Sequence, residues 1–150
     1  MKNFLLALSL MLTLSCSNSG IQDNPYLQDV GFTYDINLNL PLYSSLKVPG
    51  TAIYIGNDGV GINGIFVINL GTNSSGPFMA YEATDPNHAA NCGAMSLDGG
   101  LFAICNCDNY KYSLANGQLI EKPDDVELTK VYGMLSYRTS LSGNVLRVYN

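Results

Sequence analysis

The side chains best suited to metal binding or thiol chemistry gather in one stretch, residues 85–117. Three of the four cysteines, Cys92, Cys105 and Cys107, lie there together with the only histidine, His88. A disulfide could join Cys92 to either Cys107 or Cys105, and each pairing leaves one cysteine over. Closing a loop of about 15 residues would stabilise the fold by about 3 kcal/mol in the chain-entropy description.

Two further chemistries are open for the same stretch. A metal site could use His88, the remaining cysteine and the carboxylates of Asp85 and Asp108. A cysteine–histidine nucleophile pair is the other. Because no motif marks an oxyanion hole or a substrate cleft, we expect no enzymatic activity. The plainest alternative is a disulfide-bonded loop with an exposed histidine and a buried thiol.

The first residues indicate where the protein functions. Lys2, an apolar run over residues 4–14 and Ser15 before Cys16 are typical of a secretory signal. The run is too short to span a bilayer, which takes about 20 apolar residues. A cysteine at this place favours a bacterial lipoprotein signal, with Cys16 as the acylated residue. The alternative is an ordinary signal peptide cleaved nearby, which would leave Cys16 as an odd thiol.

This interpretation divides the chain into a signal peptide (1–15), a tether (16–29) and one β domain (30–150). It places the protein in the bacterial cell envelope, periplasmic or at the outer-membrane surface and anchored in the membrane through acyl chains. An exported protein meets an oxidising environment, where paired cysteines form disulfides. Of seven Lys and Arg residues, Lys2 leaves with the signal, so six face 12 acidic residues and the net charge becomes −6. The absence of a basic cluster argues against nucleic-acid binding.

The remaining sequence predicts many short strands that would position the Cys/His stretch. Apolar residues alternate with mostly polar ones over residues 30–42, which predicts one long half-buried strand, and Pro41 suggests that it lies at an edge or ends there. Residues 64–70 are apolar enough for a strand buried on both faces. Hairpins are expected around 98–100 and 142–144. The other predicted strands are 51–55, 78–83, 94–97, 101–105, 110–114, 131–137 and 145–149. No helical periodicity follows the signal, so we expect an all-β sandwich or small barrel.

The spacing of the Cys/His stretch resembles that of Rieske [2Fe–2S] domains. That family carries Cys-x-His, then about 15–17 residues, then Cys-x-x-His, with two histidines replacing two cysteines on one iron. Here 16 residues separate His88 from Cys105. Many members also carry a disulfide of non-ligand cysteines, and Cys92 and Cys107 stand close to those places. The resemblance covers roughly residues 53–150 and is strongest to small Rieske-like lipoproteins of Bacteroidetes-type bacteria. It implies a Rieske-like fold with an inserted Cys/His hairpin and a Cys92–Cys107 disulfide.

The ligand positions depart from the family pattern. The first cysteine of the family falls at Pro86, beside Asp85, and the last histidine falls at Asp108. Only His88 and Cys105 match, so we expect no [2Fe–2S] cofactor and a binding or structural role at the envelope. The alternatives are an electron-transfer protein with an atypical iron centre, or a mononuclear metal site at His88, Cys105, Asp85 and Asp108. The partner would be an unknown envelope or redox protein.

Overall fold

The computed structural model describes residues 24–71, 77–88, 90–124, 127 and 130–150. The predicted signal peptide and Cys16 lie outside this part of the chain. Within it, the secondary structure consists of ten β-strands and two short 3-10 helices, Ser44–Lys47 and Ala90–Cys92. None of the described helices is long and apolar enough to cross a membrane.

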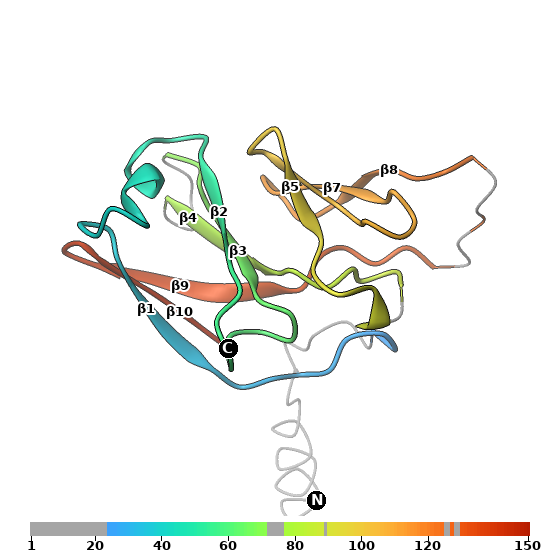
Figure 1. The fold of residues 1–150 in the computed structure, drawn as a ribbon, viewed down its shortest axis with the longest axis horizontal. Helices are drawn as coiled ribbons and strands as arrows, with labels where there is room; N and C mark the ends of the chain where they lie inside the picture. Colours follow the sequence, from blue (N-terminus) through green and yellow to red (C-terminus); the bar gives the residue numbers. More distant parts are fainter. Residues whose placement is uncertain (1–23, 72–76, 89, 125–126, 128–129) are drawn as a thin grey trace, which may run out of the picture.

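Six strands form the larger, antiparallel sheet (Figure 1). In the order in which they lie side by side, they are β1 (Thr33–Asn37), β10 (Val145–Tyr149), β9 (Ser136–Ser142), β4 (Phe78–Glu82), β3 (Ile65–Asn69) and β2 (Ala52–Ile55). The first and last strands of this order are therefore the edges of the sheet, as Pro41 suggested for the first strand.

A second sheet of four strands is inserted in the sequence between β4 and β9. Its strands are β5 (Ser96–Asp98), β6 (Phe102–Ile104), β7 (Lys111–Ser113) and β8 (Leu119–Glu121), paired in that order. Although this insertion separates them, β4 and β9 are neighbours, with Ala80 opposite Tyr137. The all-β class and the inserted Cys/His hairpin are thus confirmed. The short strand β8 was not expected from the sequence.

Strand β3 contributes to two hydrophobic clusters, one on each of its faces. Ile65 and Val67 pack with the interior of the six-stranded sheet. Phe66 and Ile68 pack with residues of the four-stranded sheet, including Tyr112. Because side chains alternate across a strand, a strand between two clusters must be apolar throughout. The prediction that this strand is buried on both faces is confirmed.

The predicted strand over residues 30–42 is wrong beyond Asn37, where β1 ends. The Oδ1 atom of Asn37 accepts a hydrogen bond from the backbone N–H of Asn39 at 3.0 Å, and its carbonyl accepts one from Leu40 N–H at 3.0 Å. Asparagine favours such turns because its side chain competes with strand pairing. Apolar residues continue to alternate in the sequence after Asn37, but they do not form a buried strand face, because Leu40 and Leu42 are 48% and 75% exposed.

The predicted strand over residues 131–137 is also displaced, because the strand observed is β9, residues 136–142. Residues 131–135 instead direct their backbone groups to other segments. Met134 N–H donates to the carbonyl of Gly117 at 2.7 Å, and Leu135 accepts from Glu82 N–H at 2.8 Å. The first bond connects this segment to the turn between β7 and β8, and the second connects it to β4. The turn that joins β9 to β10 lies around residues 142–144, as predicted.

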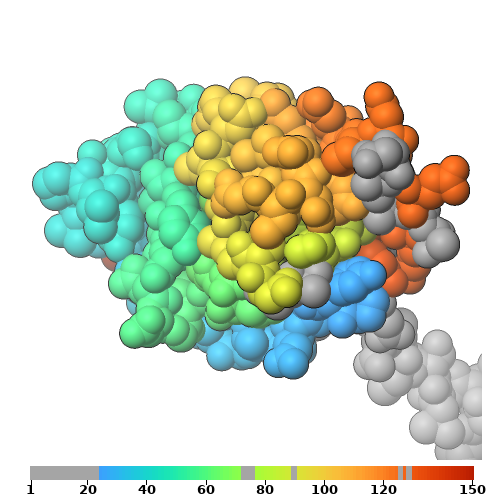
Figure 2. All heavy atoms as spheres, turned by 45° about the vertical axis from the view of Figure 1, so that its right-hand side comes forward, coloured from blue at the N-terminus to red at the C-terminus, as the bar shows by residue number. Residues whose placement is uncertain are grey.

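The first described residues of the predicted tether lie along the β domain. The side-chain amide of Asn24 donates to the carbonyl of Pro86 at 2.8 Å. Asn150, at the C-terminal end of the described chain, donates to the side chain of Asp29 and to the carbonyl of Val30. Figure 2 shows this N-terminal segment (blue) beside the yellow-green loop that follows β4.

Candidate functional site

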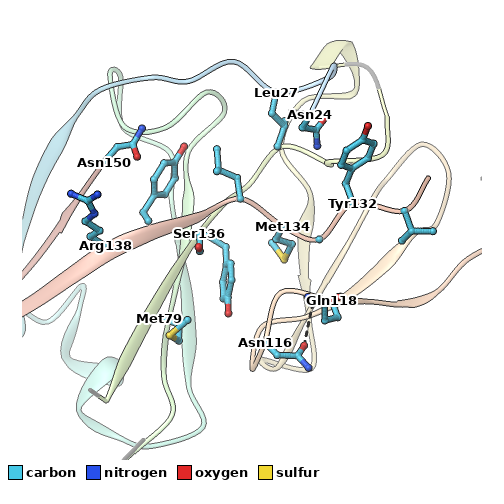
Figure 3. Close-up of a pocket in the computed structure, with 15 residues that line it drawn as sticks. Asn24, Leu27, Met79, Asn116, Gln118, Tyr132, Met134, Ser136, Arg138 and Asn150 are labelled. Carbon is cyan, nitrogen blue, oxygen red and sulfur yellow. Dashed lines mark hydrogen bonds between the residues drawn. The ribbon is translucent and has the colours of Figure 1, made fainter. Parts of the chain in front are cut away.

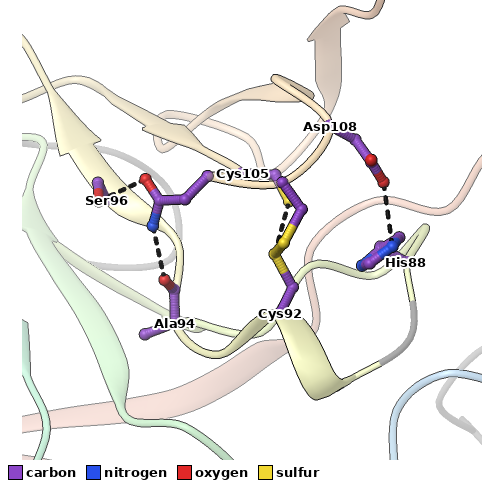
Figure 4. The surroundings of a disulfide bond; sticks show 8 residues. His88, Cys92, Ala94, Ser96, Cys105 and Asp108 are labelled. Carbon is purple, nitrogen blue, oxygen red and sulfur yellow. Dashed lines mark hydrogen bonds and ion pairs between the residues drawn. A yellow bond between two sulfur atoms is a disulfide. The ribbon is translucent and has the colours of Figure 1, made fainter.

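Two loops bring together the residues singled out in the sequence (Figure 4). The first loop follows β4 and runs to β5, and it is fixed by the bridge between Thr84 and Ala94. The second loop joins β6 to β7 and is closed by Cys105 N–H donating to the carbonyl of Tyr110 at 2.8 Å. Asn106 holds the loops together, since its Nδ2 donates to the carbonyl of Ala94 at 3.1 Å.

A disulfide joins the two loops, between Cys92 in the first and Cys107 in the second. The two Sγ atoms are 2.02 Å apart. Cys92–Cys107 is the pairing that the resemblance to Rieske domains implied. Cys107 is exposed, whereas Cys92 is half-buried. The bond therefore reaches the surface at one end and the interior at the other.

Cys105 is not in a disulfide and lies buried, with 1% exposure. Its Sγ is 3.6 Å from the Sγ of Cys92. Burial raises the pKa of the Cys105 thiol above its ordinary value, and the nearby Asp85 carboxylate contributes in the same direction. The three cysteines of the stretch thus form one compact group of sulfur atoms.

His88 and Asp108 face each other across the two loops. The Nε2 atom of His88 is 3.3 Å from Oδ2 of Asp108, and both side chains are about one third exposed (31% and 34%). The Nδ1 atom of His88 is buried and has no hydrogen-bond partner among the described residues. Asp108 therefore contacts the imidazole of the residue that matches the histidine of the first motif in the Rieske pattern.

Asp85 is buried at 1% exposure and is held by its neighbours in the fold. Its Oδ1 accepts hydrogen bonds from the hydroxyl of Tyr112 at 2.6 Å and from the backbone N–H of Asn87 at 2.7 Å. Its Oδ2 is buried without a partner in the described part of the chain. Burial, and then the charge of Asp85, raises the pKa of Tyr112 far above its ordinary range.

Asn87 is a supporting residue that sequence reasoning missed. Its Nδ2 donates to the carbonyl of Tyr132 at 2.7 Å and to the hydroxyl of Tyr112 at 2.9 Å, and its Oδ1 accepts from Tyr132 N–H at 2.8 Å. These bonds tie the first loop to the segment before β9. The partners are 25 and 45 residues away in the chain, so no local pattern could have revealed them.

The residues present do not fit a Rieske [2Fe–2S] centre. Among the described residues, the ligand-capable atoms of His88, Cys92 and Cys105 lie within 4.8 Å of one another. Cys92 is in the disulfide, however, and is not available as a thiolate. Pro86 has no ligand atom, and Asp108 contacts His88. Two of the four ligands that the cluster takes from the protein are therefore lacking.

A separate cavity of about 580 Å³ opens between the two sheets. Figure 3 shows Met79 and Met134 in its lining, with Asn116 and Gln118 from the turn between β7 and β8. Tyr81 also lines it, and burial raises the pKa of this tyrosine to about 12. The Tyr81 hydroxyl is buried without a hydrogen-bond partner among the described residues. This cavity was not anticipated, because its lining comes from segments that are distant in the sequence.

No family model matches the chain, and a search of curated proteins found no match. Several solved structures are similar to it. One is a complex of reduced oxygenase and oxidised ferredoxin in carbazole 1,9a-dioxygenase, with 18% identity, a TM-score of 0.45, and coverage of 71% of this chain and 85% of the other. A protein assigned as an NADH-dependent nitrite reductase small subunit from Mycobacterium tuberculosis has 17% identity, a TM-score of 0.42, and coverage of 81% and 97%.

A third similar structure is the terminal oxygenase of carbazole 1,9a-dioxygenase from Novosphingobium sp. KA1. It is 10% identical with a TM-score of 0.49, and the match covers 84% of this chain but 31% of the oxygenase chain. In this chain, a small sheet is inserted between two paired strands of a larger sheet, and its Cys/His loops are joined by a disulfide.

Proposed function

We propose that this chain is an exported, lipid-anchored binding module of the bacterial cell envelope that uses a Rieske-like domain without a [2Fe–2S] centre. The observation that carries the proposal is the ligand set of the two loops. Only His88 and Cys105 stand at family ligand positions with suitable atoms. Asp85 and Asp108, the candidate substitutes, already contact protein groups. The protein would act by binding and not by catalysis.

The recognition surface of this module would be the pair of loops joined by the disulfide. The bond between Cys92 and Cys107 and the hydrogen bonds of Asn106 hold the loops in one arrangement. A surface that is already ordered loses little conformational entropy when a partner binds. Exposed Asn106 and Cys107 and the partly exposed pair His88 and Asp108 offer polar contacts to a partner.

Purification under anaerobic conditions tests whether the centre is absent. We expect a colourless protein without inorganic sulfide, because the loops lack two cluster ligands. The measurements are a visible absorption spectrum and analysis of iron and acid-labile sulfide. A brown protein with stoichiometric iron and sulfide would overturn the proposal.

The membrane anchor has its own test, which does not depend on whether the protein holds a [2Fe–2S] centre. We expect Cys16→Ser to abolish both acylation, detected by mass spectrometry, and recovery in the membrane fraction. If the variant still partitions into membranes, Cys16 is not the anchor.

A mononuclear metal site is the second candidate function, and one observation favours it. Nδ1 of His88 and Oδ2 of Asp85 are both buried without partners among the described residues, and the ligand-capable atoms of His88 and the buried Cys105 lie within 4.8 Å of each other. Buried polar atoms that lack partners call for an explanation such as an ion. Sulfur, nitrogen and oxygen ligands together suit Zn²⁺.

Calorimetric titration with Zn²⁺ tests this second function. One ion should bind per chain, and His88→Ala or Asp85→Asn should weaken binding at least tenfold, because ligand number governs affinity. Asp35→Asn is a matched control, since Asp35 is an exposed carboxylate paired with Arg147 outside the site. Absence of stoichiometric binding, or equal binding by all variants, would rule out the metal site.

A further inference from the structure

We propose that Cys92, Cys105 and Cys107 form a thiol–disulfide exchange site, in which the disulfide moves between Cys92–Cys107 and Cys92–Cys105. The proposal goes beyond the binding role and needs only that Cys105 carries no metal. It stands on the 3.6 Å distance between the Sγ atoms of Cys105 and Cys92. At this distance the two atoms are in contact, so the sulfur that becomes the nucleophile on deprotonation already touches the sulfur that it would attack.

The exchange conserves atoms and electrons. The Cys105 thiol loses its proton, and its Sγ attacks the Sγ of Cys92. The new Cys92–Cys105 bond forms as the Cys92–Cys107 bond breaks, and Cys107 leaves as a thiolate that takes up a proton. One disulfide and one thiol are present before and after, so neither an oxidant nor a reductant is consumed.

Both sulfurs that compete for Cys92 come from the same turn. Cys105 and Cys107 are two residues apart, and the turn is closed by Cys105 N–H bonded to Tyr110 and by Asn109 N–H donating to the carbonyl of Cys105 at 3.0 Å. Asn109 completes it with a left-handed φ of 58°. The two pairings can therefore interchange through side-chain rotation, while β6 and β7 stay paired.

The exchange changes which thiol meets solvent. In the structure the free thiol, Cys105, is buried at 1% exposure, whereas Cys107 is exposed. After exchange the interior holds a disulfide and the surface presents the Cys107 thiol. A surface thiol can, as its thiolate, attack an accessible disulfide of a partner protein or small molecule, so that a mixed disulfide forms and the partner's other sulfur leaves as a thiol; a buried thiol cannot. The substrate class of the site is thus an accessible disulfide.

Two experiments test the exchange, both on the full chain with Cys16→Ser so that three cysteines remain. In the first, Cys107→Ser is kept in a glutathione redox buffer, and its disulfides are mapped by mass spectrometry after acid quenching. We expect a Cys92–Cys105 disulfide and no free thiol. Two free thiols in a variant with a native circular dichroism spectrum would overturn the proposal. Cys105→Ser is the matched control and should keep Cys92–Cys107.

The second experiment needs no variant within the loops. The folded protein is incubated with N-ethylmaleimide, quenched with acid and digested without reduction. We expect the label on Cys107 together with a Cys92–Cys105 disulfide. Label on Cys105 with Cys92–Cys107 intact, or no label until the protein is unfolded, would overturn the proposal. This result stands even if Cys107→Ser does not fold.

Discussion

Glu82 is a fully buried carboxylate at the end of β4, and its replacement tests how the larger sheet is held together. It is 0% exposed, and five donors surround it. Oε1 accepts from Asn63 N–H at 3.1 Å and from the N–H and hydroxyl of Thr84 at 2.9 and 2.7 Å. Oε2 accepts from Ile62 N–H at 2.8 Å and from the Tyr137 hydroxyl at 2.7 Å. One side chain thus connects the loop after β2, strand β4 and strand β9.

Glu82→Gln keeps the shape of the side chain but replaces one acceptor oxygen with an NH₂ group. If the amide oxygen takes the position of Oε1, where Asn63 and Thr84 supply three donors, the NH₂ group takes the position of Oε2 and faces Ile62 and Tyr137. The hydroxyl of Tyr137 can turn and accept, but the Ile62 N–H loses its acceptor, at a cost of about 1–3 kcal/mol. The remaining bonds lose their charge assistance, while burying a neutral group recovers part of the cost. We expect a net loss of about 3 kcal/mol.

Urea and thermal unfolding, followed by circular dichroism, measure this loss. For a domain of this size, about 3 kcal/mol lowers Tm by about 10 °C. Tyr137→Phe should cost about 1–2 kcal/mol alone and less in the Glu82→Gln background, because the charged acceptor is already gone. Glu121→Gln, on exposed β8, is the control and should stay within about 0.5 kcal/mol of the parent. A loss below about 1 kcal/mol for Glu82→Gln would refute the reasoning.

Three other predictions follow from the same structure. Gly61→Ala should destabilise the fold by about 3 kcal/mol in urea unfolding, because its Cβ would lie 2.6 Å from Oε2 of Glu82 at a φ of +66°. Gly59→Ala shares the positive φ but meets open space, so it should cost about 1–2 kcal/mol; equal costs would contradict the steric argument. Asn87→Ala should speed hydrogen exchange at the Tyr132 amide at least tenfold by mass spectrometry, and unchanged protection would show that this bond is dispensable. Raising the pH through about 10–12 should unfold the protein, because burial raises the pKa of several tyrosines above the ordinary value of about 10. These tyrosines are Tyr81, Tyr112 and Tyr137. Their protonated forms stabilise the fold below pH 10, and that stability is lost as the pH rises. Tyrosinate absorbance should therefore rise together with the loss of circular dichroism, and ionisation of these residues in folded protein would contradict the prediction.

Local patterns in the sequence predicted the features that depend on neighbouring residues. The apolar run of β3 and the Asp-Gly-Gly turn between β5 and β6 predicted a buried strand and a hairpin. The end of β1 was missed because the side chain of Asn37 forms a turn that apolar alternation does not reveal. The spacing of His88 and Cys105 indicated which loops meet. The contacts of Asn87 and the contact between Cys105 and Cys92 depend on how distant segments pack, and no spacing rule specifies them.

The hydrogen bond between Asn24 and the carbonyl of Pro86 limits how far the loops can stand from a membrane. If Cys16 carries the acyl chains as proposed, eight residues connect the lipid surface to this contact. A fully extended chain covers at most about 3.3–3.6 Å per residue, so these eight residues span less than about 30 Å. The disulfide-linked loops would then work within a thin layer above the bilayer. Partners that reach them would be membrane proteins, lipid-bound proteins or molecules small enough to enter that layer.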